Sequence, residues 1–248
     1  MDLSEVAWPT ADAAATDLAL LPVGSTEQHG PHAPLGTDHL AADAVATHGA
    51  EAYDDEVVVA PTIPVGVAEE HRQFPGTLWV SEDTFRDYVR ETVESLASHG
   101  WNRIVVVNGH GGNVAPLREC CGRVTRDGTA YAVPFTWFDA VDPQAAGLPD
   151  DAGMGHGGPV ETSLIRSLHP DLVHEEAFAQ AREDGAQGWG EWVAGTNLAY
   201  DSAEFSESGA VGDPSLSDPD VGEALLDAAA DALVEVLDAV ADRDVPDR

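Results

Sequence analysis

Runs of aliphatic and β-branched residues recur along the chain, and helix-length segments separate them. The clearest run is NRIVVVNGH at 102–110, and three others predict strands at 17–25, 56–66 and 129–138. Continuous apolar runs of this kind are typical of strands buried on both faces, and helical crossovers join such strands in parallel. The sequence therefore predicts an α/β fold with a mostly parallel sheet that is covered by helices on both faces.

Helices are expected at 38–52, 81–100, 114–126, 159–170 and 221–243. The segment 81–100 carries the strongest helix signal. Ser81 can cap its start, Gly100 can end it, and its apolar residues recur at steps of three and four. This spacing predicts an amphipathic helix that packs on the sheet.

The stretch 183–219 differs from the rest because it is rich in Gly, Ser, Asp and Pro and carries Trp189 and Trp192. This composition predicts long loops, which would serve as a lid or as a subunit contact. The chain shows no internal repeat and no shift in composition that would mark a domain boundary. We therefore expect one domain spanning 1–248, a length that suits a single α/β unit.

The chain is strongly acidic: 45 Asp and Glu side chains face 11 Arg and no Lys, a formal net charge of −34. This charge argues against binding to nucleic acid or to an anionic membrane, because both need a basic surface. No apolar run reaches about 18 residues and no signal-peptide pattern opens the chain, so we expect a cytoplasmic protein. Acidic residues spread along a chain without Lys are typical of a salt-accumulating halophile, where salt screens their repulsion.

The only two cysteines, Cys120 and Cys121, are adjacent in an expected helix. Neighbouring cysteines rarely form a disulfide, and two cannot build a disulfide framework. We interpret them as reduced thiols, at least one of which packs in the core.

Three loops place His beside Glu, Asp or Asn and beside glycines. Two of them follow expected strands, where open α/β sheets place their sites, and the third opens an expected helix. The ligand-type side chains are Glu27, His29, His32, Asp38 and His39 in the first loop, His110 in the second, and His156 and Glu161 in the third. Imidazole and carboxylate are ligands of zinc, manganese and iron. Any one loop also fits a plain connection or an anion-binding turn, but their recurrence in three loops favours a metal site.

Four blocks of the sequence resemble the signature blocks of the creatininase family, in the family's order, between about residues 20 and 170. The blocks are STEQHGPHAPLGTDHLAA, EEHRQFPGTL, VVVNGHGGN and HGGPVETS. The resemblance implies a three-layer α/β/α sandwich with a dinuclear metal centre. It also implies hydrolysis of a non-peptide C–N bond in a small molecule by metal-activated water, and a homo-oligomer, often a hexamer.

The same resemblance assigns roles to individual residues. Glu27 and His110 would hold one divalent cation (zinc, manganese or iron), His29 the second, and Asp38 both. A shared carboxylate suits two cations about 3.5–4 Å apart, because it offers an oxygen to each. For the reaction, His156 would be the general acid and Glu161 a proton shuttle or an outer ligand; His71 and Thr77 would line the pocket.

Two departures from creatininases bear on the substrate. Where they carry an aromatic residue and then a metal-binding Glu, this chain has Gly111 and Gly112, so Glu161 or water would have to complete the second cation site. The stretch DDAGMGH, with Ala152 and Gly153, also lacks the Trp that stacks on creatinine. Both features argue against creatinine as the substrate.

The Gly-Gly-Asn turn instead resembles the archaeal formamidopyrimidine nucleotide deformylases of riboflavin and deazaflavin biosynthesis. Their substrate carries a phosphate, for which Arg72 and the amides of Gly111, Gly112 and Asn113 at a helix start are the candidates. Three alternatives stay open: a creatinine amidohydrolase, a two-metal phosphoesterase, and a non-catalytic module that binds a metal or a nucleotide.

Overall fold

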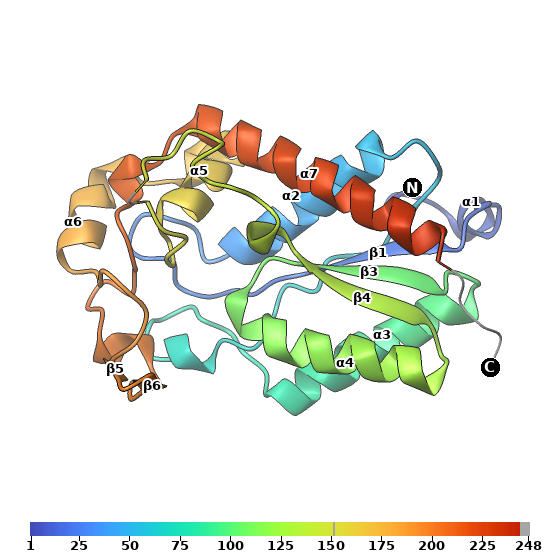
Figure 1. Cartoon of the computed structure of the whole chain (residues 1–248), viewed down its shortest axis with the longest axis horizontal. Coiled ribbons are helices and arrows are strands. Elements are labelled where there is room, and N and C mark those ends of the chain that lie inside the picture. Colours follow the sequence, from blue (N-terminus) through green and yellow to red (C-terminus); the bar gives the residue numbers. More distant parts are fainter. Residues whose placement is uncertain (151, 244–248) are drawn as a thin grey trace.

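Four parallel strands form the central sheet of the computed structural model, which describes residues 1–150 and 152–243 (Figure 1). The strands are β1 (Leu18–Val23), β2 (Val58–Val59), β3 (Arg103–Asn108) and β4 (Tyr131–Thr136), in the order β2-β1-β3-β4. Asp151 of the DDAGMGH stretch and residues 244–248 of the expected domain lie outside the described residues. The parallel sheet confirms the predicted fold class.

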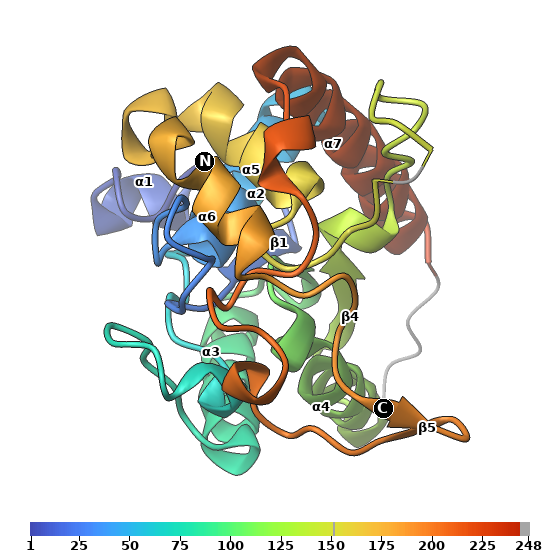
Figure 2. The ribbon, with the colours of Figure 1, turned by 90° about the vertical axis from the view of Figure 1, so that its left-hand side faces the viewer.

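Helices cover both faces of the sheet (Figures 1 and 2). Leu18 and Leu20 of β1 point into one core, with α2 (Thr37–Ala52), α5 (Pro159–Leu168) and α7 (Pro219–Ala241). The alternate residues Ala19 and Leu21 point into the other core, with α3 (Glu82–Ser98) and α4 (Val114–Asp127). Side chains alternate between the faces of a strand, so both faces must be apolar to bury the sheet on both sides. The arrangement is the three-layer α/β/α sandwich that was expected.

The ends of the main helices follow from local sequence. The Ser81 side chain accepts a hydrogen bond from the Thr84 amide and caps α3, as predicted for 81–100. Gly128 ends α4 in the left-handed conformation, with φ at 78°. Asp218 caps α7 and Pro219 occupies its first position, where a missing N–H costs nothing.

The expectation of a strand over 56–66 was wrong for most of that range. Only Val58–Val59 pair as a strand, and the chain beyond forms a single bridge, from Ile63 to Val23. Pro61 and Pro64 explain this, because proline cannot donate to a ladder.

Several short elements were not predicted from sequence. They include α1 (Trp8–Asp12), α6 (Phe178–Glu183) and a hairpin of β5 (Trp192–Val193) and β6 (Thr196–Asn197). The hairpin interrupts the 183–219 stretch, which otherwise forms turns and short 3-10 helices, as expected for loops. Figure 1 shows the hairpin at the end of the molecule where β1 and β3 finish.

Among the described residues, no helix is both long and apolar enough to cross a membrane. Cys120 and Cys121 are free and buried on α4, in agreement with the interpretation of packed thiols.

Candidate metal centre

Five ligand-type side chains meet at the carboxyl ends of β1 and β3. Glu27 and His29 come from the loop after β1, Asp38 from the first turn of α2, His110 from the turn after β3, and Glu161 from the first turn of α5. All five are buried, and Glu27 and His29 have no exposed surface. The structure thus brings together side chains that are up to 134 residues apart in the chain.

Three groups of possible metal ligands are found among the described residues: one comprises Glu27, His29 and His156, and the other two share Asp38. Of these two, Glu27, Asp38 and His110 make one group, and His29, Asp38 and Glu161 make the other; in each, one ligand atom per residue lies within 4.8 Å of the others. The two oxygens of Asp38 face different groups: Oδ1 lies 3.0 Å from His29 Nε2, and Oδ2 lies 3.1 Å from His110 Nδ1. This is the arrangement that a carboxylate shared by two cations requires.

Backbone carbonyls hold both ligand histidines. Nδ1 of His29 donates to the Glu27 carbonyl at 3.1 Å, and Nε2 of His110 donates to the Val67 carbonyl at 2.6 Å. The opposite nitrogens, Nε2 of His29 and Nδ1 of His110, therefore face the carboxylates. Metal-ligating histidines in proteins are fixed in the same way, through a hydrogen bond from the second ring nitrogen.

Several of these buried atoms make no well-aligned hydrogen bond among the described residues and only face one another as close histidine–carboxylate pairs: both carboxylate oxygens of Glu27, Oδ2 of Asp38 and Nε2 of His29. Buried polar atoms are costly without a partner, so a concentration of them in one place needs an explanation. Divalent cations would satisfy all of them, and the imidazole and carboxylate donors suit zinc, manganese or iron.

When no cation is bound, protonated histidines offset the negative charge of the carboxylates. Burial alone would lower the pKa of His29, but the Asp38 carboxylate raises it to about 10. In the same way Glu27 and Asp38 outweigh burial and raise the pKa of His110 well above its usual value. Burial also works against the ionised form of Asp38, yet the two histidines hold the pKa of Asp38 below its usual range. Cation binding must therefore displace protons from this centre.

Glu161 supplies a carboxylate where Gly112 has none. Its Oε2 accepts a hydrogen bond from the Gly157 amide at 2.6 Å and lies 3.9 Å from His29 Nε2, while burial raises the pKa of Glu161 to about 7. A Cβ atom at Gly112 would lie 2.2 Å from the Val67 carbonyl oxygen. The turn after β3 therefore has no room for a ligand side chain at position 112, and α5 brings Glu161 to the second group instead.

A second layer of imidazoles lies beside the two groups. His156 Nε2 donates to the Gln28 carbonyl at 2.6 Å, which turns its Nδ1 toward Glu27 Oε1 at 3.8 Å. The rings of His71 and His156 stack with centroids 4.3 Å apart. Burial, together with the positive charge on His29, lowers the pKa of His71 to about 3 and that of His156 well below its usual value. Both rings are therefore neutral.

A cavity of about 360 Å³ opens onto these residues. Trp189, from the loop before β5, forms part of its wall, with its ring 5.8 Å from His156 and 5.6 Å from His71. Glu70 lines the cavity as well. Sequence reasoning missed both as site residues: the only signals were a Trp in a Gly-rich loop and an acidic residue directly before His71.

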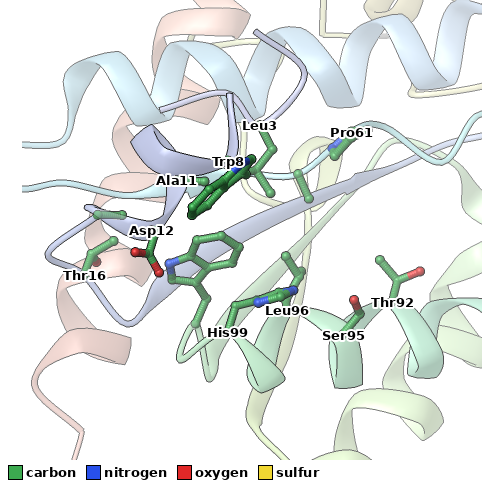
Figure 3. Close-up of a pocket in the computed structure, with 13 residues that line it drawn as sticks. Leu3, Trp8, Ala11, Asp12, Thr16, Pro61, Thr92, Ser95, Leu96 and His99 are labelled. Atoms are coloured by element: carbon green, nitrogen blue, oxygen red, sulfur yellow. The ribbon is translucent and has the colours of Figure 1, made fainter. Parts of the chain in front are cut away.

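A larger cavity of about 500 Å³ lies elsewhere, between the N-terminal segment and α3 (Figure 3). Trp8, Asp12, Leu96 and His99 are among the residues that line it. The three groups of possible metal ligands found among the described residues all lie at the carboxyl ends of the strands. The candidate site is therefore the smaller cavity.

Two histidines and a threonine from the predicted loops do not join the groups. His32 Nε2 lies 3.0 Å from Thr162 Oγ1, and His39 Nδ1 donates to the Ser25 carbonyl at 3.1 Å. Thr77 Oγ1 accepts from the Gln28 amide. These three side chains brace the loop after β1, and the ligand-type rings of His32 and His39 belong to none of the groups of possible metal ligands.

Only two of the four residues expected to bind phosphate line the cavity. Gly111 and Gly112 line the cavity. The buried Asn113 side chain joins two loops by hydrogen bonds with the Val67 amide and the Gly24 carbonyl. Arg72 does not line the cavity, because Asp201 holds its guanidinium through contacts of 2.8 and 2.6 Å.

The chain matches the family model for creatininase, described as creatinine amidohydrolase, over residues 4–237. It is 39% identical over 160 residues to a mycofactocin precursor peptide peptidase of Mycolicibacterium smegmatis, a match that covers 63% of this chain and 60% of that protein. It is 31% identical over 233 residues to the protein of the same name from Mycobacterium tuberculosis, covering 87% of this chain and 82% of that one.

Solved structures of creatininases resemble the whole fold. A crystal structure of creatinine amidohydrolase superimposes with a TM-score of 0.81 and 26% identity and covers 98% of both chains. A structure described as a manganese form of creatininase gives a TM-score of 0.80 and 25% identity, with 98% of this chain and 99% of that chain covered.

Proposed function

The chain belongs to the creatininase family of metal-dependent amidohydrolases, and from this premise we propose that it hydrolyses the formamide of a formamidopyrimidine nucleotide at a two-cation centre. The observation that carries the two-cation centre is the position of Asp38. Its two oxygens face two ligand groups, and each group also holds one histidine and one further carboxylate. In this proposal Glu161 is a ligand of the second cation, in the position that Gly112 cannot fill.

The cations would lie between the carboxylates of Glu27, Asp38 and Glu161 and the ring nitrogens of His29 and His110. When bound, such a pair activates water and polarises a carbonyl oxygen. The remaining steps belong to the protein. Neutral His156, whose Nε2–H is committed to the Gln28 carbonyl, presents Nδ1 as the atom that takes a proton and passes it to the leaving nitrogen.

The position of His156 is itself determined by its surroundings. His71 stacks on one side of its ring, and His29 lies on another with ring centroids 4.3 Å apart. Its backbone exchanges two hydrogen bonds with Val211, so the loop before α7 also fixes it. These contacts hold the His156 ring in one orientation, with Nδ1 on the side of the carboxylates.

Two features support a formamide of a small molecule. The cavity of about 360 Å³ suits a small planar group, and the Gly-Gly-Asn turn with Glu161 replaces the ligand arrangement expected of creatininases. A second candidate is cleavage of a peptide amide, which the similarity to mycofactocin precursor peptide peptidases favours.

Metal analysis and a substrate panel test this proposal. We expect about two divalent cations per chain. We also expect formate release from the formamidopyrimidine nucleotide, with at most slow amine release from a peptide amide, slow opening of creatinine, and no phosphate release from a phosphate monoester. Peptide cleavage as the fastest reaction would select the second candidate, and phosphate release would favour a phosphoesterase.

The variant Asp38→Asn separates an enzyme from a binding module. It should lose both cations and at least about 1000-fold in turnover, because each group loses its shared ligand. The matched control is Glu51→Gln, which neutralises an exposed carboxylate on the same helix and should change neither property. Full hydrolysis by Asp38→Asn would contradict the bridging assignment.

A further inference from the structure

Glu70 is a carboxylate of the cavity wall that the cation groups do not use. It lies in the short 3-10 helix Glu69–His71 and is half-buried. Among the described residues it belongs to none of the three ligand groups and forms no ion pair. The nearby Arg72 cannot neutralise it, because its guanidinium is bound to Asp201.

The position of Glu70 relative to the turn after β3 is well defined. A Cβ atom at Gly112 would lie 3.1 Å from Glu70 Oε1 and 2.5 Å from His110 Nε2. The Glu70 carboxylate therefore stands directly over the glycine turn, next to a cation ligand. Any substrate that reaches the cations along this turn must pass beside it.

The charge of the lining restricts what can bind there. Glu27, Asp38 and Glu161 serve the proposed cations, which leaves Glu70 as a lining carboxylate without an ion pair, and no Arg side chain of the described residues lines the cavity. A phosphate at this wall would meet a like charge. Trp189 and Phe138 add flat aromatic surface. The wall therefore suits a planar group that donates hydrogen bonds.

We propose that Glu70 is the specificity-determining residue of this site, and that its two oxygens accept two N–H groups from an N–C–N edge of the substrate. A 2-aminopyrimidinone has such an edge, as does a guanidino group. Carboxylates bind paired donors of this kind through two parallel hydrogen bonds. The inference rests on the proposed function, and it places the phosphate of a nucleotide substrate outside the cavity.

The test compares two formamides in the purified, metal-loaded enzyme. One carries a 2-aminopyrimidinone ring, and the other is formanilide, a planar formamide without the N–C–N edge. Glu70→Gln replaces one acceptor oxygen with a donor and should lower kcat/KM for the first by about 10- to 100-fold, mainly through KM. Formanilide turnover should change less than about twofold, and cation content should not change. Glu69→Gln, at the exposed neighbouring position, is the control and should behave as wild type.

Binding of isocytosine, which has the edge but no amide, provides a readout without turnover. Calorimetry should detect binding to the wild type and to Glu69→Gln, with affinity for Glu70→Gln weaker by about 10-fold or more. If the wild type cleaves neither formamide but binds isocytosine through Glu70, the proposed function fails and this inference stands. Equal losses on both formamides, loss of a cation in Glu70→Gln, or unchanged isocytosine binding would each overturn it.

Discussion

Position 112 is a glycine, so it offers no side chain to the second ligand group. The Val67 carbonyl and the His110 ring approach this position so closely that a Cβ atom cannot fit. The same Val67 carbonyl accepts a hydrogen bond from His110 Nε2 and orients that ring. The close approach of the Val67 backbone therefore requires glycine at position 112. The carboxylate of the second ligand group comes instead from Glu161 on α5.

Replacing Gly112 with Ala should therefore destabilise the protein by about 1–3 kcal/mol, because the Val67 carbonyl must move. It should also weaken cation binding, since that carbonyl holds His110. Thermal unfolding and metal analysis measure the two effects. Gly111→Ala is the matched control: a Cβ atom there has nothing within 4 Å, so stability should stay within about 0.5 kcal/mol of wild type. Equal behaviour of the two variants would refute the steric explanation.

Cys121 should be unreactive in the folded protein. Burial raises the pKa of its thiol from 9.0 to about 12, so almost no thiolate exists at pH 8. Iodoacetamide should modify it at least about 100-fold more slowly than in the urea-unfolded chain, as followed by mass spectrometry. The unfolded chain loses this proton near pH 9 and the folded chain does not, so stability should fall as the pH rises above 9. Rapid labelling of the native protein at pH 8 would contradict this placement.

At the scale of elements, helix packing holds the proposed ligands in place. α2 carries Asp38 in its first turn and packs against α7, and α7 also packs against α5, which carries Glu161. Glycines allow the close contacts: a Cβ atom at Gly49 would lie 2.6 Å from the Leu233 side chain, and one at Gly222 would lie 2.0 Å from the Ser163 carbonyl oxygen. α7 contributes none of the proposed ligands, yet it sets the distance between two helices that do.

Leu233→Ala tests this role of α7. Its side chain is fully buried, so truncation should cost about 2–5 kcal/mol in the free energy of unfolding. Because one core joins the three helices, we expect a single unfolding transition and weaker cation binding. Chemical denaturation and metal titration measure these. Glu235→Ala, at an exposed position of the same helix, should change stability by less than about 0.5 kcal/mol. Two separate transitions would argue against the single domain predicted over 1–248.

At the scale of the whole molecule, the metal centre links distant parts of the chain. The loop after β1, the turn after β3 and the start of α5 all meet there. The molecule also carries a net charge of −34, which favours an extended chain unless it is screened. The homo-oligomer expected from the family resemblance stays a prediction, which light scattering in solution would measure.

Removing the cations should lower the melting temperature. Ligand binding stabilises a folded protein by about 4 kcal/mol when the free ligand is at 1000 times its Kd. Dialysis against a chelator should therefore lower Tm, and added zinc or manganese should restore it. Asp38→Asn should show no response to the chelator or to the metals. A wild-type Tm that ignores the chelator, in protein shown by analysis to have lost its metal, would contradict a structural link through the centre.

Salt should stabilise this protein strongly. At about 1 M salt the Debye length falls to about 3 Å, so repulsion among the surface carboxylates is largely screened. We expect Tm to rise continuously between 0.1 and 2 M potassium chloride, and to rise more than in an equally concentrated solution of a neutral osmolyte. Maximal stability at low salt would contradict the halophilic interpretation of the composition.

Amino-acid order alone determined most of the architecture and the ligand types. Apolar periodicity fixed the sheet and the helices α2, α3, α4, α5 and α7, because burial on both faces requires continuous apolar strands. It overextended β2, where Pro61 and Pro64 prevent pairing, and it missed the short α1 and α6, in which few residues are buried. Local pattern also identified the ligand loops, since three separate loops place His beside Glu, Asp or Asn and beside glycines.

Only the tertiary structure decided which of these side chains converge. His29 joins a ligand group while His32, three residues later, hydrogen-bonds to Thr162; the family resemblance separates the two histidines, but spacing alone does not. Trp189 and Glu70 reach the cavity from loops whose paths depend on long-range packing. Glu161 reaches His29 and Asp38 from the first turn of α5, in a part of the chain far from both. Distances between segments far apart in the chain are set by the packed core as a whole, and local sequence does not encode them.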